Sequence, residues 1–187
     1  MLHVCTPLFR FDNIQKIYDE FLDKKNITWH VSYSNKKEKP NIKEHKRINI
    51  IFYPIECEEK ETFKKRNIIF ENIHDGYFSL LDDDTTFHPN MFLHYEKLKK
   101  IKYNGMLIGQ QIFKDGKIRL KANMPVSCYI DTGNVLCHHS CLKTCKWPEK
   151  TIGFYNRDFL FWKSVFIFYQ NTMQLVQDPI SYYNKLR

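Results

Sequence analysis

The feature that most constrains the fold is an alternation of strand-like and helical patterns along the first 82 residues. Runs rich in β-branched and aromatic residues, typical of strands, alternate with stretches whose apolar residues recur at helical spacing. This β-α-β alternation predicts an α/β layered domain with a largely parallel sheet. The expected strands are residues 2–8, 27–34, 48–55 and 76–82, and the expected helices are residues 13–25 and 60–73.

Residues 104–122 carry a different pattern, in which two β-runs flank the turn Asp115-Gly116. An Asp-Gly pair between such runs is a strong hairpin signal, so this segment predicts antiparallel strands. No stretch is rich enough in proline, glycine and serine to act as a linker, and we find no internal repeat. With 187 residues, of which 43% are hydrophobic, residues 1–187 are expected to form one domain with a substantial core.

Cysteine content and hydropathy predict the compartment. Six cysteines in 187 residues do not make a disulfide scaffold and predict reduced thiols in the cytosol. The N-terminus lacks the charged region and the long apolar run of a signal peptide. The most apolar stretch, residues 159–169, is too short to span a bilayer and contains Lys163. We therefore expect a soluble, cytoplasmic protein without a transmembrane segment.

The charge of the chain indicates anionic partners. The formal net charge of +8 favours a phosphorylated ligand, a nucleic acid or an acidic membrane surface. Lysines cluster in residues 35–47 and 97–102, which is equally typical of a solvated basic face. Charge alone therefore does not choose among these anions.

Three consecutive aspartates, Asp82, Asp83 and Asp84, stand at the end of the last expected strand. Like charges side by side repel, so this arrangement needs a positive partner. Ligands of open α/β sheets bind beyond the carboxyl ends of the strands. Mg²⁺ or Mn²⁺ is held there by one or two carboxylates plus the phosphates of a substrate. The aspartates thus predict a metal–diphosphate site, and a solvated acidic turn or a helix cap is the structural alternative.

Two longer segments surround these signals. Residues 64–85, KKRNIIFENIHDGYFSLLDDDT, combine the pair Arg66-Asn67 with a strand that ends in Asp-x-Asp. Residues 4–21, VCTPLFRFDNIQKIYDEF, read as an opening strand, a Thr-Pro loop and a helix. These segments resemble the GT-A superfamily of nucleotide-sugar glycosyltransferases, and the resemblance covers nearly the whole chain except residues 36–62. It implies a single α/β/α sandwich of GT-A type with a mixed, mostly parallel central sheet.

The resemblance also implies an activity. It indicates a metal-dependent glycosyltransferase that moves a sugar from a nucleotide-sugar donor, above all a UDP-sugar, to a hydroxyl group of a glycan acceptor. Residues 1–84 would form the nucleotide-binding half and residues 85–187 the acceptor-side half. Asp84, together with Asp82, is implied as a ligand of Mn²⁺ or Mg²⁺ on the diphosphate.

The nucleotide contacts follow from the same motifs. One early aspartate of the trio is implied at the ribose. Many relatives place an aspartate against the base where this chain has Ser34 and Asn35, so one of these two residues is expected to take that role. The residues implied at the nucleotide are Thr6, Pro7, Arg10, Ser34, Asn35, Arg66, Asn67, Asp82 and Asp83.

Sugar transfer with inversion, the outcome we expect, needs a base for the acceptor hydroxyl and a Lewis acid for the departing diphosphate. Asp131 and Asp158 are the candidate bases. Residues 131–142 and 152–162 are similar to the family's acceptor-side strand and to the helix that begins with the catalytic carboxylate, and residues 179–187 to a closing strand.

The two candidate bases differ in their local patterns. Asp158 precedes a helical pattern, where the helix dipole favours an ionised carboxylate. The resemblance favours Asp158 as the base, and a simple helix cap is the alternative. Asp131 is expected to orient the acceptor or the donor sugar, and its alternative is an Asx turn before Gly133.

Two other functions fit parts of the sequence. The run DDDTT also matches aspartate-nucleophile phosphatases, with Asp82 as nucleophile, Asp84 as acid/base and Thr86 behind them. That motif normally follows the first strand, and no later acidic pair is present to complete it. A noncatalytic nucleic-acid-binding domain would suit the charge, but the aspartates would repel a phosphate backbone.

Other conspicuous residues have structural explanations. The segment CHHSCLKTC, residues 137–145, contains possible zinc ligands, but its cysteines recur every four residues and are expected to be buried free thiols. Trp29, His30 and the aromatic residues between 159 and 169 are expected in the core.

Overall fold

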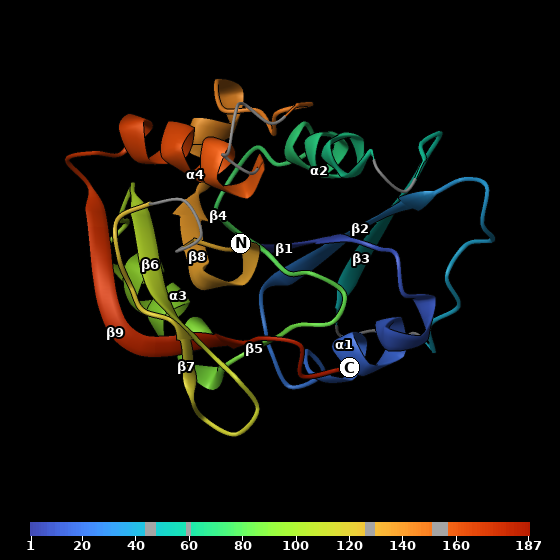
Figure 1. The fold of residues 1–187 in the computed structure, drawn as a ribbon, viewed down its shortest axis with the longest axis horizontal. Coiled ribbons are helices and arrows are strands. Elements are labelled where there is room, and N and C mark those ends of the chain that lie inside the picture. The colour runs from blue at the N-terminus through green and yellow to red at the C-terminus, as the bar shows by residue number, and fades with distance from the viewer. Residues whose placement is uncertain (44–47, 59–60, 126–129, 151–156) are drawn as a thin grey trace.

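The computed structural model describes residues 1–43, 48–58, 61–125, 130–150 and 157–187. The strands in this part of the chain form one sheet in the order β3-β2-β1-β4-β8-β6-β9-β5, and β7 pairs with β6 (Figure 1). The strands are β1 (Leu2–Pro7), β2 (Ile27–Ser34), β3 (Asn49–Ile55), β4 (Tyr77–Leu80), β5 (Thr86–Phe87), β6 (Met106–Ile112), β7 (Ile118–Leu120), β8 (Val135–His138) and β9 (Met173–Tyr182). The helices are α1 (Ile14–Asp19), α2 (Thr62–Phe70), α3 (Pro89–Lys100) and α4 (Arg157–Phe168), with 3₁₀ helices η1 (Phe11–Asn13), η2 (Thr132–Asn134) and η3 (His139–Lys143).

The strands of the N-terminal half are parallel, and β1 lies between β2 and β4. Cys5 of β1 stands opposite His30 of β2 and Leu80 of β4, so these strands run toward the same edge of the sheet. The loop after β1 and the aspartates after β4 therefore leave the sheet side by side. This is the edge at which the sequence predicts the ligand.

The second half adds antiparallel strands. β8 pairs antiparallel with both β4 and β6, and β9 returns parallel to β6. The hairpin predicted over residues 104–122 is confirmed by the antiparallel pair β6 and β7. Gly116 lies in its turn with φ of +85°, a conformation that favours glycine.

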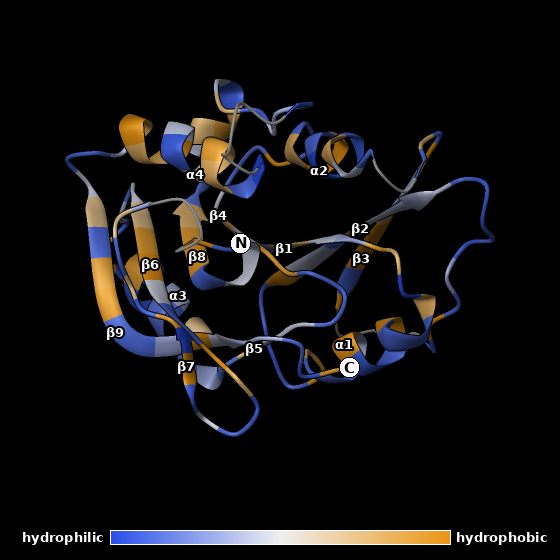
Figure 2. Cartoon of the chain, viewed as in Figure 1, coloured by the Kyte–Doolittle hydropathy of each residue, from blue (hydrophilic) through white to orange (hydrophobic). Residues whose placement is uncertain are grey.

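Helices cover both faces of the sheet (Figure 1). On one face, Phe70 of α2 and Trp162 of α4 pack in one buried cluster with Phe78 of β4. On the other face, Ile17 of α1 and Tyr95 of α3 belong to a second cluster. Apolar residues are concentrated along β6 and β8 and on α4 (Figure 2). The predicted α/β/α layering is therefore confirmed. Among the helices of the described residues, none has both the length and the apolar character needed to cross a bilayer.

The first helix is shorter than the expected 13–25. α1 ends at Asp19, and the chain continues in tight turns, in which the N–H of Phe21 donates to the carbonyl oxygen of Tyr18 at 2.9 Å. Asn26 then adopts a φ of 61°, which redirects the chain into β2. The expected helix was too long because its apolar spacing continues into turns that also bury apolar side chains.

The acceptor-side expectations need several corrections. Only Val135–His138 of residues 131–142 form a strand, because 3₁₀ helices precede and follow it. Residues 152–156 of the similar segment 152–162 lie outside the described residues, and α4 is described from Arg157, next to Asp158. The closing strand β9 begins at Met173, before the expected 179–187, and ends at Tyr182.

The predicted core residues are mostly buried. Trp29 and His30 are buried as expected. The aromatic stretch 159–169 is core packing only in part, because Phe168 remains 46% exposed. The expectation was wrong for this residue.

Candidate active site

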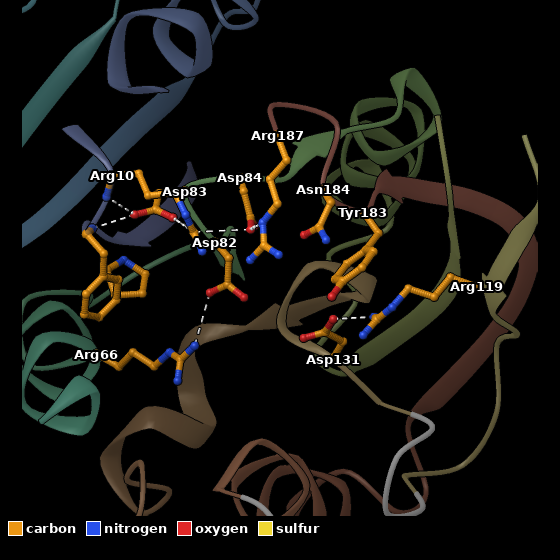
Figure 3. A pocket seen from close by; sticks show the side chains of 12 residues that line it. Arg10, Arg66, Asp82, Asp83, Asp84, Arg119, Asp131, Tyr183, Asn184 and Arg187 are labelled. Carbon is orange, nitrogen blue, oxygen red and sulfur yellow. Dashed lines mark hydrogen bonds and ion pairs between the residues drawn. The ribbon is translucent and has the colours of Figure 1, made fainter. Parts of the chain in front are cut away.

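A pocket of about 310 Å³ opens at the edge where β1 and β4 end. It gathers charged side chains of both signs from segments far apart in the sequence (Figure 3). Its lining residues are Pro7, Phe9, Arg10, Arg66, Asp82, Asp83, Asp84, Arg119, Asp131, Tyr183, Asn184 and Arg187.

Asp83 ties the loop after β1 to the end of β4. Its Oδ2 accepts hydrogen bonds from the backbone N–H groups of Phe9, at 2.5 Å, and of Arg10, at 2.6 Å. Its Oδ1 lies 2.5 Å from Nη1 of Arg10. The side-chain amide of Asn13 donates to the Asp83 carbonyl oxygen at 2.9 Å. Both carboxylate oxygens of this buried residue are thus engaged by the protein itself.

Asp84 is buried beneath the C-terminal segment. Its Oδ2 lies 2.7 Å from Nε of Arg187 and 3.2 Å from Nη1 of Arg10. The N–H of Leu186 donates to the Asp84 carbonyl oxygen at 3.1 Å. Two guanidinium groups therefore balance this carboxylate.

Asp82 faces the other side of the pocket. Its Oδ1 lies 3.2 Å from Nη2 of Arg66, and its Oδ2 accepts a hydrogen bond from Oγ1 of Thr132 at 2.8 Å. Burial raises the pKa of Asp82, and the positive charge of Arg66 opposes that rise.

Asp131 forms a turn, as the structural alternative predicted, and its proposed role toward a sugar stays a prediction. Its Oδ1 accepts the N–H of Thr132 at 2.7 Å, and with Asn134 it forms a capping box at the start of η2. Its Oδ2 lies 2.5 Å from Nη1 of Arg119. The Arg119 guanidinium stacks on the ring of Tyr183 at 3.6 Å. Asp131 is therefore both a turn-forming residue and part of the pocket wall.

Asp158 lies in the first turn of α4, next to Arg66. Its Oδ1 is 3.6 Å from Nη1 of Arg66. Burial raises the pKa of Asp158 to about 6, and the nearby Asp82 and Asp131 add to the rise while Arg66 opposes it. Asp158 thus contacts Arg66 but is not among the residues that line the pocket.

A divalent cation fits this pocket by the chemistry of its donor set. Asp82 and Asp84 offer only oxygen ligands, and Mg²⁺ takes its remaining ligands from phosphates and water. Within the described residues, no group of three or more His, Cys, Asp or Glu side chains could hold a metal ion. A cation here would therefore depend on a phosphorylated ligand to complete its coordination.

The zinc alternative finds no support in the described part of the chain. Cys137 and Cys141 are free and buried, with their Sγ atoms 3.8 Å apart. Burial raises the pKa of the Cys141 thiol far above its usual range, so it stays protonated. The expectation of buried free thiols is confirmed for these residues.

Four residues implied at the nucleotide do not line the pocket. Thr6 is buried and accepts a hydrogen bond from Nε1 of Trp29 at 2.9 Å. The Ser34 hydroxyl donates to the carbonyl oxygen of Cys57 at 3.1 Å. Asn67 uses its side-chain amide on the backbone of residue 147, and Asn35 lies after β2. Their nucleotide contacts stay predictions.

Several pocket residues were not expected. Phe9 lies next to the predicted Thr-Pro loop, and its ring faces Nζ of Lys65 at 3.6 Å. Arg119 lies on β7, where the hairpin pattern gave no functional signal. Tyr183, Asn184 and Arg187 belong to the tail, for which the sequence predicted only a strand. Their place in the pocket depends on the path of the tail after β9.

No protein-family model and no curated protein sequence matches the chain. Among solved structures, S. aureus TarS 1–349 is similar with a TM-score of 0.69 and 12% identity, over 97% of this chain and 59% of that chain. TarS 1–349 in complex with UDP-GlcNAc gives a TM-score of 0.70 and 11% identity, over 97% and 57%. TarS 1–349 in complex with UDP gives 0.68 and 11%, over 97% and 59%.

These likenesses concern the fold. The sheet and its flanking helices match the TarS chains over nearly the whole of this chain, which confirms the predicted α/β fold class of GT-A type. The chain spans 59% of the length of TarS 1–349.

Proposed function

We propose that this protein is a glycosyltransferase that moves a sugar from a UDP-linked donor to a hydroxyl group of a glycan acceptor. One observation carries the proposal: Arg66 lies between Asp82 of the aspartate trio and Asp158 at the start of α4. Arg66, which lines the pocket, thus connects a candidate donor-binding carboxylate to a candidate base carboxylate. Residues 1–84 would supply the nucleotide-binding half and residues 85–187 the acceptor side. The fold of TarS, which has been solved with UDP-GlcNAc and with UDP, supports this proposal.

In this proposal the pocket binds the donor through its charges. Arg10 and Arg187 lie on Asp84 and can turn to the oxygens of a diphosphate. Asp82 and Asp84 would hold Mn²⁺ or Mg²⁺. When bound, that ion acts as a Lewis acid that stabilises the leaving diphosphate.

Asp158 is the better of the two candidate bases. A carboxyl pKa of about 6 leaves Asp158 ionised at neutral pH and raises its basicity. Asp131 already accepts from the N–H of Thr132 and pairs with Arg119. Asp158 would therefore take the proton of the acceptor hydroxyl, with inversion at the sugar, and Asp131 would orient Arg119 on the acceptor side.

A thermal-shift experiment tests the proposal. UDP-GlcNAc and UDP should raise the melting temperature with Mn²⁺ present, through ligand linkage. CMP and a simple phosphate ester should raise it less. Absence of any metal-dependent stabilisation by uridine nucleotides would overturn the UDP donor. Release of phosphate from small phosphoesters, abolished by Asp82→Asn, would favour the phosphatase alternative instead.

A further inference from the structure

Arg66 occupies an unusual position for a surface-helix arginine. It belongs to α2, yet only 7% of it is exposed, and its guanidinium lies between two carboxylates. Nη2 is 3.2 Å from Oδ1 of Asp82, and Nη1 is 3.6 Å from Oδ1 of Asp158. Its Nε is buried and has no hydrogen-bond partner among the described residues. The two ion pairs therefore account for this costly burial.

An aromatic platform fixes the guanidinium plane. Cζ of Arg66 lies 4.1 Å from the centre of the Trp147 ring. The backbone of Trp147 is held by Asn67, which donates Nδ2 to the Trp147 carbonyl oxygen at 3.0 Å and accepts the Trp147 N–H at 2.8 Å. The Trp147 ring stacks on Phe161 of α4 at 4.5 Å. Arg66 is thus pinned relative to the helix that carries Asp158.

The charges around Asp158 come from several elements. Arg66 of α2 and Arg119 of β7 favour its ionised form. Asp82 after β4 and Asp131 before η2 oppose it, as does burial. Arg66 has the largest effect among these charges, and it is the one that also contacts Asp82.

We infer that Arg66 is a positioning residue that links the donor-side Asp82 to Asp158 and fixes the position of the Asp158 carboxylate. The link itself is a property of the ligand-free protein, and its use in catalysis rests on the proposed function. Arg66→Lys cannot reproduce it, because an ammonium lacks the planar fork that contacts both carboxylates.

Carboxyl NMR of the ligand-free protein tests the link independently of any reaction. The Asp158 carboxyl signal, assigned with Asp158→Asn, should titrate near pH 6 in the wild type. Arg66→Gln removes a positive charge and should raise that midpoint by about one pH unit. Arg157→Gln is the matched control, because it removes the same charge one residue away and should move the midpoint less. An unchanged midpoint in Arg66→Gln, or an equal change in both variants, overturns the inference.

Kinetics with UDP-GlcNAc test its use in transfer. In Arg66→Gln the acid limb of the profile of kcat against pH should move to higher pH together with the Asp158 midpoint. The value of kcat should fall by a larger factor than KM changes. Arg66→Lys provides a second measurement if the glutamine variant does not fold. It should show a partly raised midpoint and a reduced kcat, and wild-type values for both would overturn the inference. Failure of the wild type to bind UDP-GlcNAc would instead refute the proposed function. The NMR titration alone would then show whether Arg66 controls the Asp158 carboxylate.

Discussion

Asp83 holds Arg10 by its main chain and its side chain at once. One carboxylate oxygen accepts the Arg10 N–H at 2.6 Å, and the other lies 2.5 Å from Arg10 Nη1. The middle aspartate of the trio is therefore committed to holding the loop after β1. Its neighbours Asp82 and Asp84 instead contact only the side chains of arginines, Arg66 for Asp82, and Arg10 and Arg187 for Asp84, among the charged groups of the pocket.

This division of roles predicts that Asp83→Asn impairs folding. The variant loses a charge-assisted bond to Arg10 and weakens two bonds to backbone N–H groups in a buried place. We expect the free energy of unfolding to fall by about 2 kcal/mol, the scale of losing hydrogen bonds to a buried charged group. Urea denaturation measures this loss. A variant as stable as the wild type would show that Asp83 does not clamp the loop.

Asp84→Asn should act on ligand binding. We expect most of the Mn²⁺-dependent stabilisation by UDP to disappear and the transfer rate to fall by orders of magnitude, because the metal loses a charged ligand. Asp83 still holds Arg10, so the loop after β1 should stay in place. Calorimetric titration of UDP with and without Mn²⁺ checks this prediction, and undiminished metal-dependent binding would refute the role of Asp84.

Asp158→Asn should separate chemistry from binding. Donor affinity should stay near normal, while turnover should fall by roughly 10² to 10⁴, the usual contribution of a general base. Asp131→Asn is the matched carboxylate control, and it should mainly weaken the contact with Arg119, because asparagine can keep the capping hydrogen bond. If the two variants exchanged these phenotypes, the base would be Asp131.

The pH dependence of stability gives a second test of Asp158. Burial raises its pKa to about 6 in the folded protein, so the folded state prefers the protonated form. Its stabilising contribution is present below the ordinary carboxyl pKa and is lost as the pH rises through about 6. Asp158→Asn should therefore be more stable than the wild type at neutral pH. A simple helix cap predicts no such gain, because asparagine and aspartate cap helices about equally well.

A buried chain of side chains predicts a loss of stability in acid. His3 bonds through Nε2 to Asp75 at 2.8 Å and through Nδ1 to Nε2 of His30 at 2.9 Å, and Nδ1 of His30 bonds to the Tyr53 hydroxyl at 2.8 Å. Burial lowers the pKa of His30 to about 3 and also lowers that of His3. Their contribution is present above the ordinary histidine pKa and is lost as the pH falls below about 6.5.

The free energy of unfolding of His30→Phe should therefore fall less between neutral and acid pH than that of the wild type. Circular dichroism during urea titrations at several pH values measures the slope. The solvent-exposed His74 supplies the control, since His74→Phe should leave the slope unchanged. Equal slopes in the wild type and His30→Phe would show that His30 does not control acid stability.

The fold was largely predictable because it depends on local patterns. Alternating apolar runs predicted the parallel half, and Asp115-Gly116 predicted the hairpin. The strand before Asp82 predicted that this residue lies at the edge of the sheet where β1 and β4 end. The separate partners of Asp83 and Asp84 could not be predicted, because they depend on where the loop after β1 and the tail come to rest.

The rest of the site is built from contacts distant in sequence. Arg119 lines the pocket because β7 lies beside it. Arg187 lines the pocket because the tail turns back after β9. The Arg66-Asn67 pair was noticed, but its link to Trp147 was not. A tryptophan in an irregular segment carries no periodic signal that would place it beneath an arginine.

The short strand β4 has a mechanical consequence. It is bonded to β1 on one side and to β8 on the other, where Tyr77 pairs with His138 and Phe78 with Cys137. A hinge motion that separates the β1 side of the sheet from the β8 side would therefore break backbone hydrogen bonds of β4. If the pocket binds a nucleotide as proposed, we expect movement of the tail near Asp84 to control its release, and we expect that release to limit the rate of turnover.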